Sequence, residues 1–81
     1  MDGRDFGWAL AELRRVGRVT RTGWNGSGMW IMLITQWGVF DPLPSGMPLL
    51  PWIGMRTGDG GFVPWLPSQT DLLATDWMAA P

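Results

Sequence analysis

The sequence has no cysteine and no histidine, and it also lacks lysine and tyrosine. Without cysteine no disulfide can stabilise a chain this short, and without cysteine or histidine the usual zinc ligand sets are absent. The imidazole base, the thiol nucleophile and the amine that many enzymes use are missing as well, so only carboxylates remain for catalysis. These absences predict a protein that is not an enzyme and that uses no metal and no cofactor.

Long hydrophobic runs and a strong charge of one sign are missing too. The longest apolar run is Met29–Ile34, whereas a membrane span needs about 18 residues, and the N-terminus lacks the pattern of a signal peptide. The formal net charge is −1, which is not the footprint of a protein that binds extended nucleic acid. We therefore expect no membrane partner, no extended nucleic-acid partner and a cytoplasmic location.

Tryptophan is present in excess, with seven in 81 residues. This length allows one domain at most, which we place at residues 1–81, and each tryptophan buries about 150–250 Å². One small core cannot easily hide seven indoles, so some should lie at a subunit interface or a ligand site. The composition thus predicts an oligomer interface, a ligand site or both. The tryptophans are Trp8, Trp24, Trp30, Trp37, Trp52, Trp65 and Trp77.

The first part of the chain predicts a helix followed by a hairpin. A helix over residues 6–16 would begin after Asp5 as N-cap and end before Gly17 as the left-handed residue. Its apolar stripe would consist of Phe6, Leu10, Leu13 and Val16. Residues 18–21 alternate as a short strand, for which we expect Val19 inward and Arg21 outward. The Asn-Gly pair in residues 23–26 predicts a turn into a buried strand at 29–35.

The second part predicts another hairpin and a short helix. Prolines and glycines in residues 37–51 indicate a long variable loop. Strands at 52–57 and 61–65 would flank the turn at 58–60. Ser68 and Asp71 have capping-box spacing and predict a helix to about residue 76. The fold class is therefore α+β, with an N-terminal helix, a small twisted antiparallel sheet of two hairpins and a short C-terminal helix.

Two segments carry residue types suited to a nucleotide. Trp24 offers a stacking face, Asn25 beside Gly26 offers an amide, and Arg21 offers a guanidinium for phosphate. The competing interpretation is that Trp24 covers the core edge, Asn25 serves the turn and Arg21 is solvated. The carboxylates do not form a catalytic pair, since Asp71 and Asp76 would lie about 140° apart around one helix.

The second segment lies near the C-terminal helix. Ser68, Gln69 and Asp71 could receive a ribose or an anion at its N-terminus, and Trp65 could form the other wall of the pocket. The competing interpretation is simple helix capping, with Trp65 in the core.

Three motifs together resemble a known family. They are R-x-G-W-N-G at residues 21–26, P-W-I-x-M-R-T-x-D-G at residues 51–60 and P-W-x-x-S-Q-x-D-L-L-A-x-D-W at residues 64–77. The chain from Phe6 to Trp77 is similar to the phage Thoeris anti-defence two family. The resemblance carries the Trp-Asn motif onto Trp24 and Asn25, and the last motif onto Trp65, Ser68, Gln69 and Asp71.

The resemblance implies a phage or prophage protein that sequesters cyclic nucleotide immune signals without cleaving them. The implied ligands are glycocyclic ADP-ribose isomers and also cyclic oligonucleotides, held between the subunits of a homotetramer in the cytoplasm of the infected or lysogenic host. Two other hypotheses stay open at this point. One is a protein-interaction module that uses exposed tryptophans and the proline-rich loop, and the other is hydrolysis of the signal by carboxylates.

Overall fold

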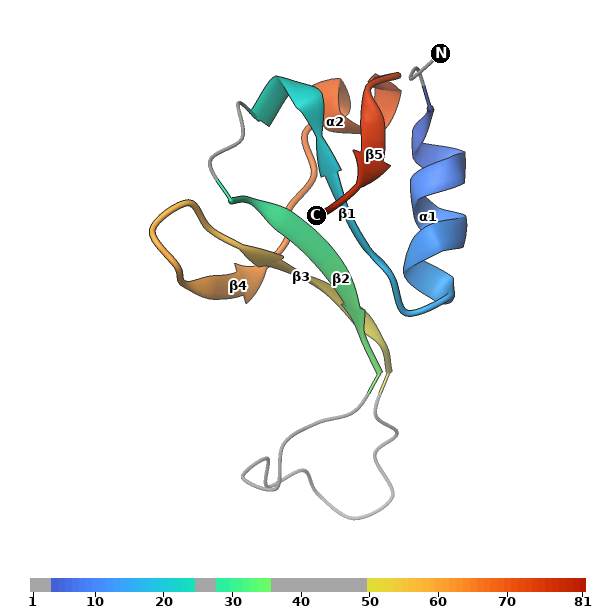
Figure 1. The fold of residues 1–81 in the computed structure, drawn as a ribbon. Helices are drawn as coiled ribbons and strands as arrows, with labels where there is room; N and C mark the ends of the chain where they lie inside the picture. Colours follow the sequence, from blue (N-terminus) through green and yellow to red (C-terminus); the bar gives the residue numbers. More distant parts are fainter. Residues whose placement is uncertain (1–3, 25–27, 36–49) are drawn as a thin grey trace, which may run out of the picture.

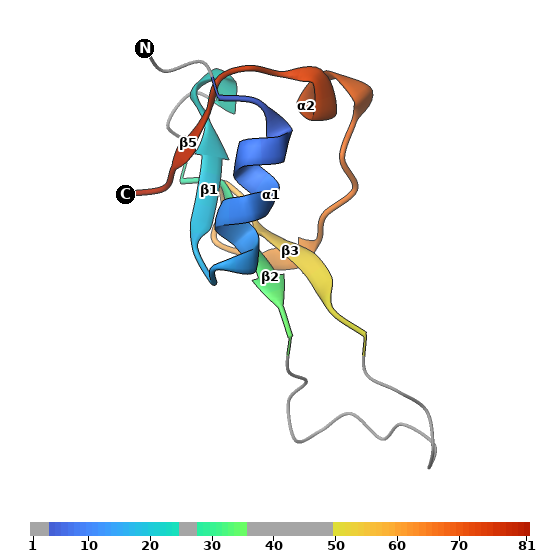
Figure 2. The same cartoon turned by 90° about the vertical axis from the view of Figure 1, so that its right-hand side faces the viewer.

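A computed structural model describes residues 4–24, 28–35 and 50–81, and its fold is α+β, as the sequence predicts (Figure 1). One antiparallel sheet has the strand order β4-β3-β2-β1-β5. Helix α1 packs against β1, β2 and β5, and it also contacts the short helix α2 (Figure 2). No helix within the described ranges is long and apolar enough to cross a bilayer.

Helix α1 spans Phe6–Arg14, and Asp5 is its N-cap, as predicted. The Asp5 carboxylate accepts a hydrogen bond from the Trp8 backbone N–H at 2.9 Å. The predicted C-terminus is wrong, because Val16 and not Gly17 takes the left-handed conformation, with φ of 64°. The N–H groups of Val16 and Gly17 donate to the carbonyls of the last turn and close a Schellman motif. Val16 is therefore 78% exposed and does not join the apolar stripe.

The first predicted hairpin is confirmed, since β1 (Arg18–Arg21) pairs with β2 (Trp30–Ile34). A 3-10 turn, η1 (Thr22–Trp24), follows β1, while Asn25 and Gly26 lie outside the described residues. The expectation that Arg21 points outward is wrong. Side chains alternate along a strand, so Arg21 shares a sheet face with Val19, which is fully buried.

The second predicted hairpin is also confirmed, with β3 (Trp52–Arg56) paired to β4 (Phe62–Pro64). The turn contains Gly60 at φ of 94°, a conformation that suits glycine. The Thr57 N–H donates to the Gly61 carbonyl at 2.8 Å and closes the hairpin. Most of the predicted loop at 37–51 lies outside the described residues.

The C-terminal region contains an element that the sequence did not predict. The capping box between Ser68 and Asp71 is confirmed, but helix α2 spans only Gln69–Leu73 and not residues up to 76. The chain then forms β5 (Trp77–Ala79), which pairs with β1. Strand β5 brings Trp77 into the core with no exposed surface.

The two faces of the sheet differ in chemistry. The face under α1 holds the core, which consists of Ala9, Leu13, Val19, Ile31, Trp65 and Trp77. We call the other face the open face, and its side chains are exposed or partly exposed. In the strand register its central row consists of Thr20, Trp30, Arg56 and Phe62, and its next row includes Arg18 and Met32.

Candidate functional site

Arg21 lies between two carboxylates on the core side of the sheet. Its Nε donates to Asp76 Oδ1 at 2.7 Å, and its Nη1 donates to Asp71 Oδ1 at 2.8 Å. The expectation that these aspartates diverge is wrong. Helix α2 ends at Leu73, so Asp76 lies outside the helix and the angular argument does not apply to it. We call Arg21, Trp24, Asp71 and Asp76 the arginine cluster.

The arginine cluster favours the charged forms of Arg21, Asp71 and Asp76. The hydrogen bond to Asp76 raises the pKa of Arg21 above its ordinary value. The same contact lowers the pKa of Asp76, which also accepts the Gly23 N–H at 2.8 Å. Burial opposes ionisation of Asp71, but hydrogen bonds from Arg21, Ser68 and Trp24 outweigh it and lower its pKa. The side chains of Arg21 and Asp71 are only 15% and 16% exposed.

The predicted aromatic walls pack against the same region. Trp24 is partly buried and meets Trp77 edge to face, with centroids 5.3 Å apart. Trp65 is 8% exposed and packs on Phe6 and Trp77, so within one chain it belongs to the core. Ser68 caps α2, whereas Gln69 is exposed at its first turn. The structure thus unites Arg21, Trp24 and Asp71, but as a packed network whose polar groups already have partners.

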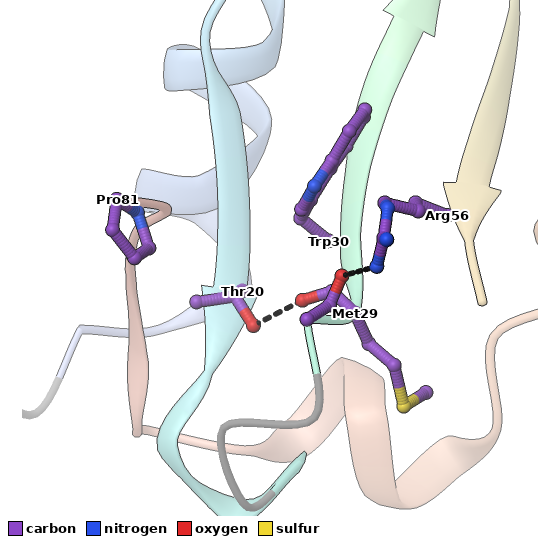
Figure 3. A pocket seen from close by; sticks show the side chains of 6 residues that line it. Thr20, Met29, Trp30, Arg56 and Pro81 are labelled. Carbon is purple, nitrogen blue, oxygen red and sulfur yellow. Dashed lines mark hydrogen bonds between the residues drawn. The ribbon is translucent and has the colours of Figure 1, made fainter. Parts of the chain in front are cut away.

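A cavity of about 320 Å³ lies on the open face, at the inner strands β1, β2 and β3. We call it the Trp30 pocket; it is lined by Thr20, Gly28, Met29, Trp30, Arg56 and Pro81. Figure 3 shows the indole of Trp30 beside the guanidinium of Arg56, on neighbouring strands. A volume of this size lies at the lower end of small-molecule sites, which is enough for one nucleotide unit.

Main-chain carbonyls position the polar groups of the Trp30 pocket. Arg56 Nη1 donates to the Gly28 carbonyl at 2.8 Å, and Thr20 Oγ1 donates to the Met29 carbonyl at 2.7 Å (Figure 3). Gly28 has φ of 79°, and a Cβ there would lie 2.7 Å from Arg56 Nη1. Glycine therefore lets the main chain approach the guanidinium closely.

The charge of the Trp30 pocket is positive. Arg56 lines it, and Arg18 lies at its rim, where its guanidinium carbon is 4.9 Å from the Trp30 ring centroid. No Asp or Glu is among the lining residues. An indole face, a hydroxyl and guanidinium groups are the side chains that bind a nucleobase, a ribose and a phosphate.

Sequence reasoning missed the Trp30 pocket because its residues come from three strands, from the segment before β2 and from position 81. The sequence placed Trp30 only in the buried strand at 29–35, and it placed Arg56 only in the second hairpin and in the motif at residues 51–60. A usable signal was present, since pairing the two predicted strands at 29–35 and 52–57 brings these residues close together. Among the described residues, no group of three or more carboxylates comes together to hold a metal ion.

Comparison with known proteins identifies a family that matches almost the whole chain. The family described as the Thoeris anti-defense 2-like domain matches residues 4–80. The protein named Thoeris anti-defense 2 of Bacillus phage SP01 is 35% identical over 79 residues, which cover 89% of each chain. The chain belongs to the Thoeris anti-defense 2-like family.

Proposed function

We propose that this protein counters Thoeris immunity by binding a cyclic nucleotide signal and sequestering it without cleavage. The ligands would be glycocyclic ADP-ribose isomers or cyclic oligonucleotides, and the protein would act in the cytoplasm of an infected or lysogenic bacterium. Family membership supports the anti-Thoeris role, because the SP01 relative carries that name. The absence of histidine, cysteine and lysine from the sequence supports binding over catalysis.

The observation that carries the proposal is the Trp30 pocket. It offers a stacking surface, a hydroxyl and a guanidinium within one cavity of about 320 Å³. Base-on-indole stacking contributes about 1–3 kcal/mol per base, and hydrogen bonds between charged groups contribute about 1.5–3 kcal/mol each. Those contacts together favour a ligand that carries both a base and a phosphate.

The residues chosen from the sequence divide between two roles in this proposal. Trp24, Asn25 and Gly26 directly precede Gly28 and Met29, which line the Trp30 pocket, so we retain them as candidate ligand contacts. Gln69 remains a candidate because its amide is on an exposed helix turn. Arg21, Trp65, Ser68 and Asp71 are proposed instead to hold the fold.

Assembly into a homotetramer is part of the proposal. The open face presents Trp30, Met32 and Trp52, all only partly buried in one chain. Leucines around α2 are exposed as well, with Leu66 at 89% and Leu73 at 80%. Apolar surface in two separate places is what a closed tetramer with two kinds of interface needs. Light scattering at micromolar concentration should give four times the chain mass.

The decisive experiment incubates the protein with each candidate signal, removes unbound ligand and then denatures the protein by heat. Sequestration predicts that the signal is released with unchanged mass, in an amount that matches the heat of binding measured by calorimetry. Released material of altered mass would indicate hydrolysis instead. If none of the glycocyclic ADP-ribose isomers or cyclic di- and trinucleotides binds, the proposal is wrong.

A matched pair of variants connects the result to the site. Trp30→Ala removes the stacking surface, whereas Arg15→Ala removes an exposed cation that pairs only weakly with Glu12, at 3.6 Å. We expect the first to abolish release of intact signal and the second to leave it unchanged. The alternative of a protein-interaction module predicts that no signal is released and that a protein partner is recovered by pull-down.

A further inference from the structure

Arg18 is held only loosely at the rim of the Trp30 pocket. Its guanidinium carbon lies 4.9 Å from the Trp30 ring centroid, and its Nη2 donates to the Pro81 carbonyl at a long 3.4 Å. Both contacted residues line the pocket. Within the described residues, no Asp or Glu side chain lies within 4.0 Å of Arg18. Arg18 thus covers an indole face and has no Asp or Glu partner among the described residues.

The contacts that hold Arg18 in place are weak compared with those a ligand offers. An exposed cation–π contact changes an equilibrium by only about two- to fivefold, and a hydrogen bond of 3.4 Å adds little. A base stacked on the indole contributes about five- to hundredfold, and a guanidinium paired with a phosphate about ten- to hundredfold. A ligand that supplies both would displace Arg18 and give it a better partner.

We infer that Arg18 makes the Trp30 pocket selective for phosphate-bearing ligands. In the free protein its guanidinium covers the indole, and in the complex it leaves the ring to a base and pairs with the phosphate of the same ligand. An uncharged nucleoside must displace Arg18 without offering it a partner, so it binds weakly. This inference rests on the proposed function only in taking the Trp30 pocket as the ligand site.

The test compares AMP with adenosine, two probes that differ by one phosphate. Binding is followed by NMR through the indole N–H signal of Trp30, assigned with a Trp30→Phe variant, because this readout detects weak complexes. The wild-type protein should bind AMP at least about tenfold more tightly than adenosine. Arg18→Ala should weaken AMP binding about threefold and strengthen adenosine binding about threefold, so that a tenfold preference disappears.

Two further variants separate selectivity from a general loss of charge or fold. Arg15→Ala removes the same charge from an exposed position on the C-cap of α1 and should keep the preference for AMP. Arg18→Lys keeps the charge but loses the planar fork, and it should retain part of the preference.

The inference is overturned if Arg18→Ala lowers the affinity for AMP and adenosine equally, or if it changes neither affinity. It is also overturned if the wild-type protein binds neither probe. Sequestration is judged separately, by release of intact cyclic signal from the wild-type protein, so the two ideas can fail independently.

Discussion

Two regions of this protein use arginine in opposite ways. Arg21 is clamped by Asp71 and Asp76 on the core side of the sheet, with donor distances of 2.7 and 2.8 Å. Arg56 and Arg18, on the open face, bond main-chain oxygens, and no Asp or Glu side chain lines the Trp30 pocket. Two carboxylates neutralise the charge of a guanidinium and so weaken its attraction for an anionic ligand. Main-chain carbonyls leave that charge available.

The contrast shows why residue type alone is a poor guide to the site. Arg21 and Arg56 both stand in motifs that carry the family resemblance. Arg21 nevertheless ties β1 to Asp71 of α2 and to Asp76, whereas Arg56 faces a cavity beside an indole. Four experiments should separate the cluster that stabilises the fold from the pocket that is proposed to bind the ligand.

The largest expected effect comes from Arg21→Met. It leaves two carboxylates close together without a cation, and removing one partner from a partly buried ion pair costs about 3 kcal/mol. Urea unfolding at neutral pH should show this loss, while the fraction that remains folded should bind ligand as the wild type does. A stable Arg21→Met protein that has lost binding would reverse the roles assigned to the two regions.

Arg56→Met should have the opposite profile. Loss of one charge-assisted contact weakens ligand binding by about 2 kcal/mol, or roughly thirtyfold, while the free energy of unfolding changes by less than about 0.5 kcal/mol. Calorimetry and urea unfolding on the same preparation measure the two quantities. Equal losses in both would mean that Arg56 acts mainly through its bond to the Gly28 carbonyl.

Acid should weaken the arginine cluster and leave the Trp30 pocket unaffected. The folded-state pKa values of Asp71 and Asp76 are lowered, so the unfolded chain takes up protons first as the pH falls. Their contribution is complete above the unfolded pKa of about 3.9 and is lost as the pH drops through the folded values. Urea unfolding between pH 7 and pH 2 should show this loss.

The matched comparison for acid sensitivity is Asp76→Asn. Since this variant cannot ionise at position 76, the stability gap between it and the wild type should narrow below about pH 4. A gap that stays constant down to pH 2 would contradict the assignment of the stabilising charge to Asp76.

The smallest expected effect is a gain in stability from Val16→Gly. A β-branched residue at φ of 64° is strained, and Val16 is 78% exposed, so little packing is lost. After allowing for the entropy of glycine in the unfolded chain, we expect about 0.5–1 kcal/mol of added stability. Thermal unfolding detects a shift of this size, and ligand affinity should not change.

Local signals predicted most of the fold. Asp5 as N-cap, the capping box at Ser68 and the two hairpins each depend on a few neighbouring residues, and the structure confirms them. Strand β5 was missed because Trp77–Ala79 is too short to show periodicity and exists only through pairing with β1. The end of α1 was missed because glycine is the usual left-handed residue there, and this chain uses Val16.

The candidate site was harder to predict because its residues meet only through the register in which the strands pair. Trp30 and Arg56 are adjacent only once β2 pairs with β3, and Arg18 reaches the indole only across the β1–β2 pair. The prediction for residues 18–21 placed Arg21 outward, although side-chain alternation along a strand puts Arg21 on the same sheet face as Val19. Applying strand alternation consistently would have predicted a partner for Arg21.

The late position of β5 in the chain has a consequence for how the protein folds. Arg21 and Asp76 are 55 positions apart, so the two hairpins can close long before β5 meets β1. Until then the aromatic rings that pack on Trp77 are exposed to solvent, and a nascent chain is prone to aggregate. We therefore expect the pairing of β5 with β1 to limit the rate of folding. A change that stabilises the arginine cluster before this pairing should increase the folding rate.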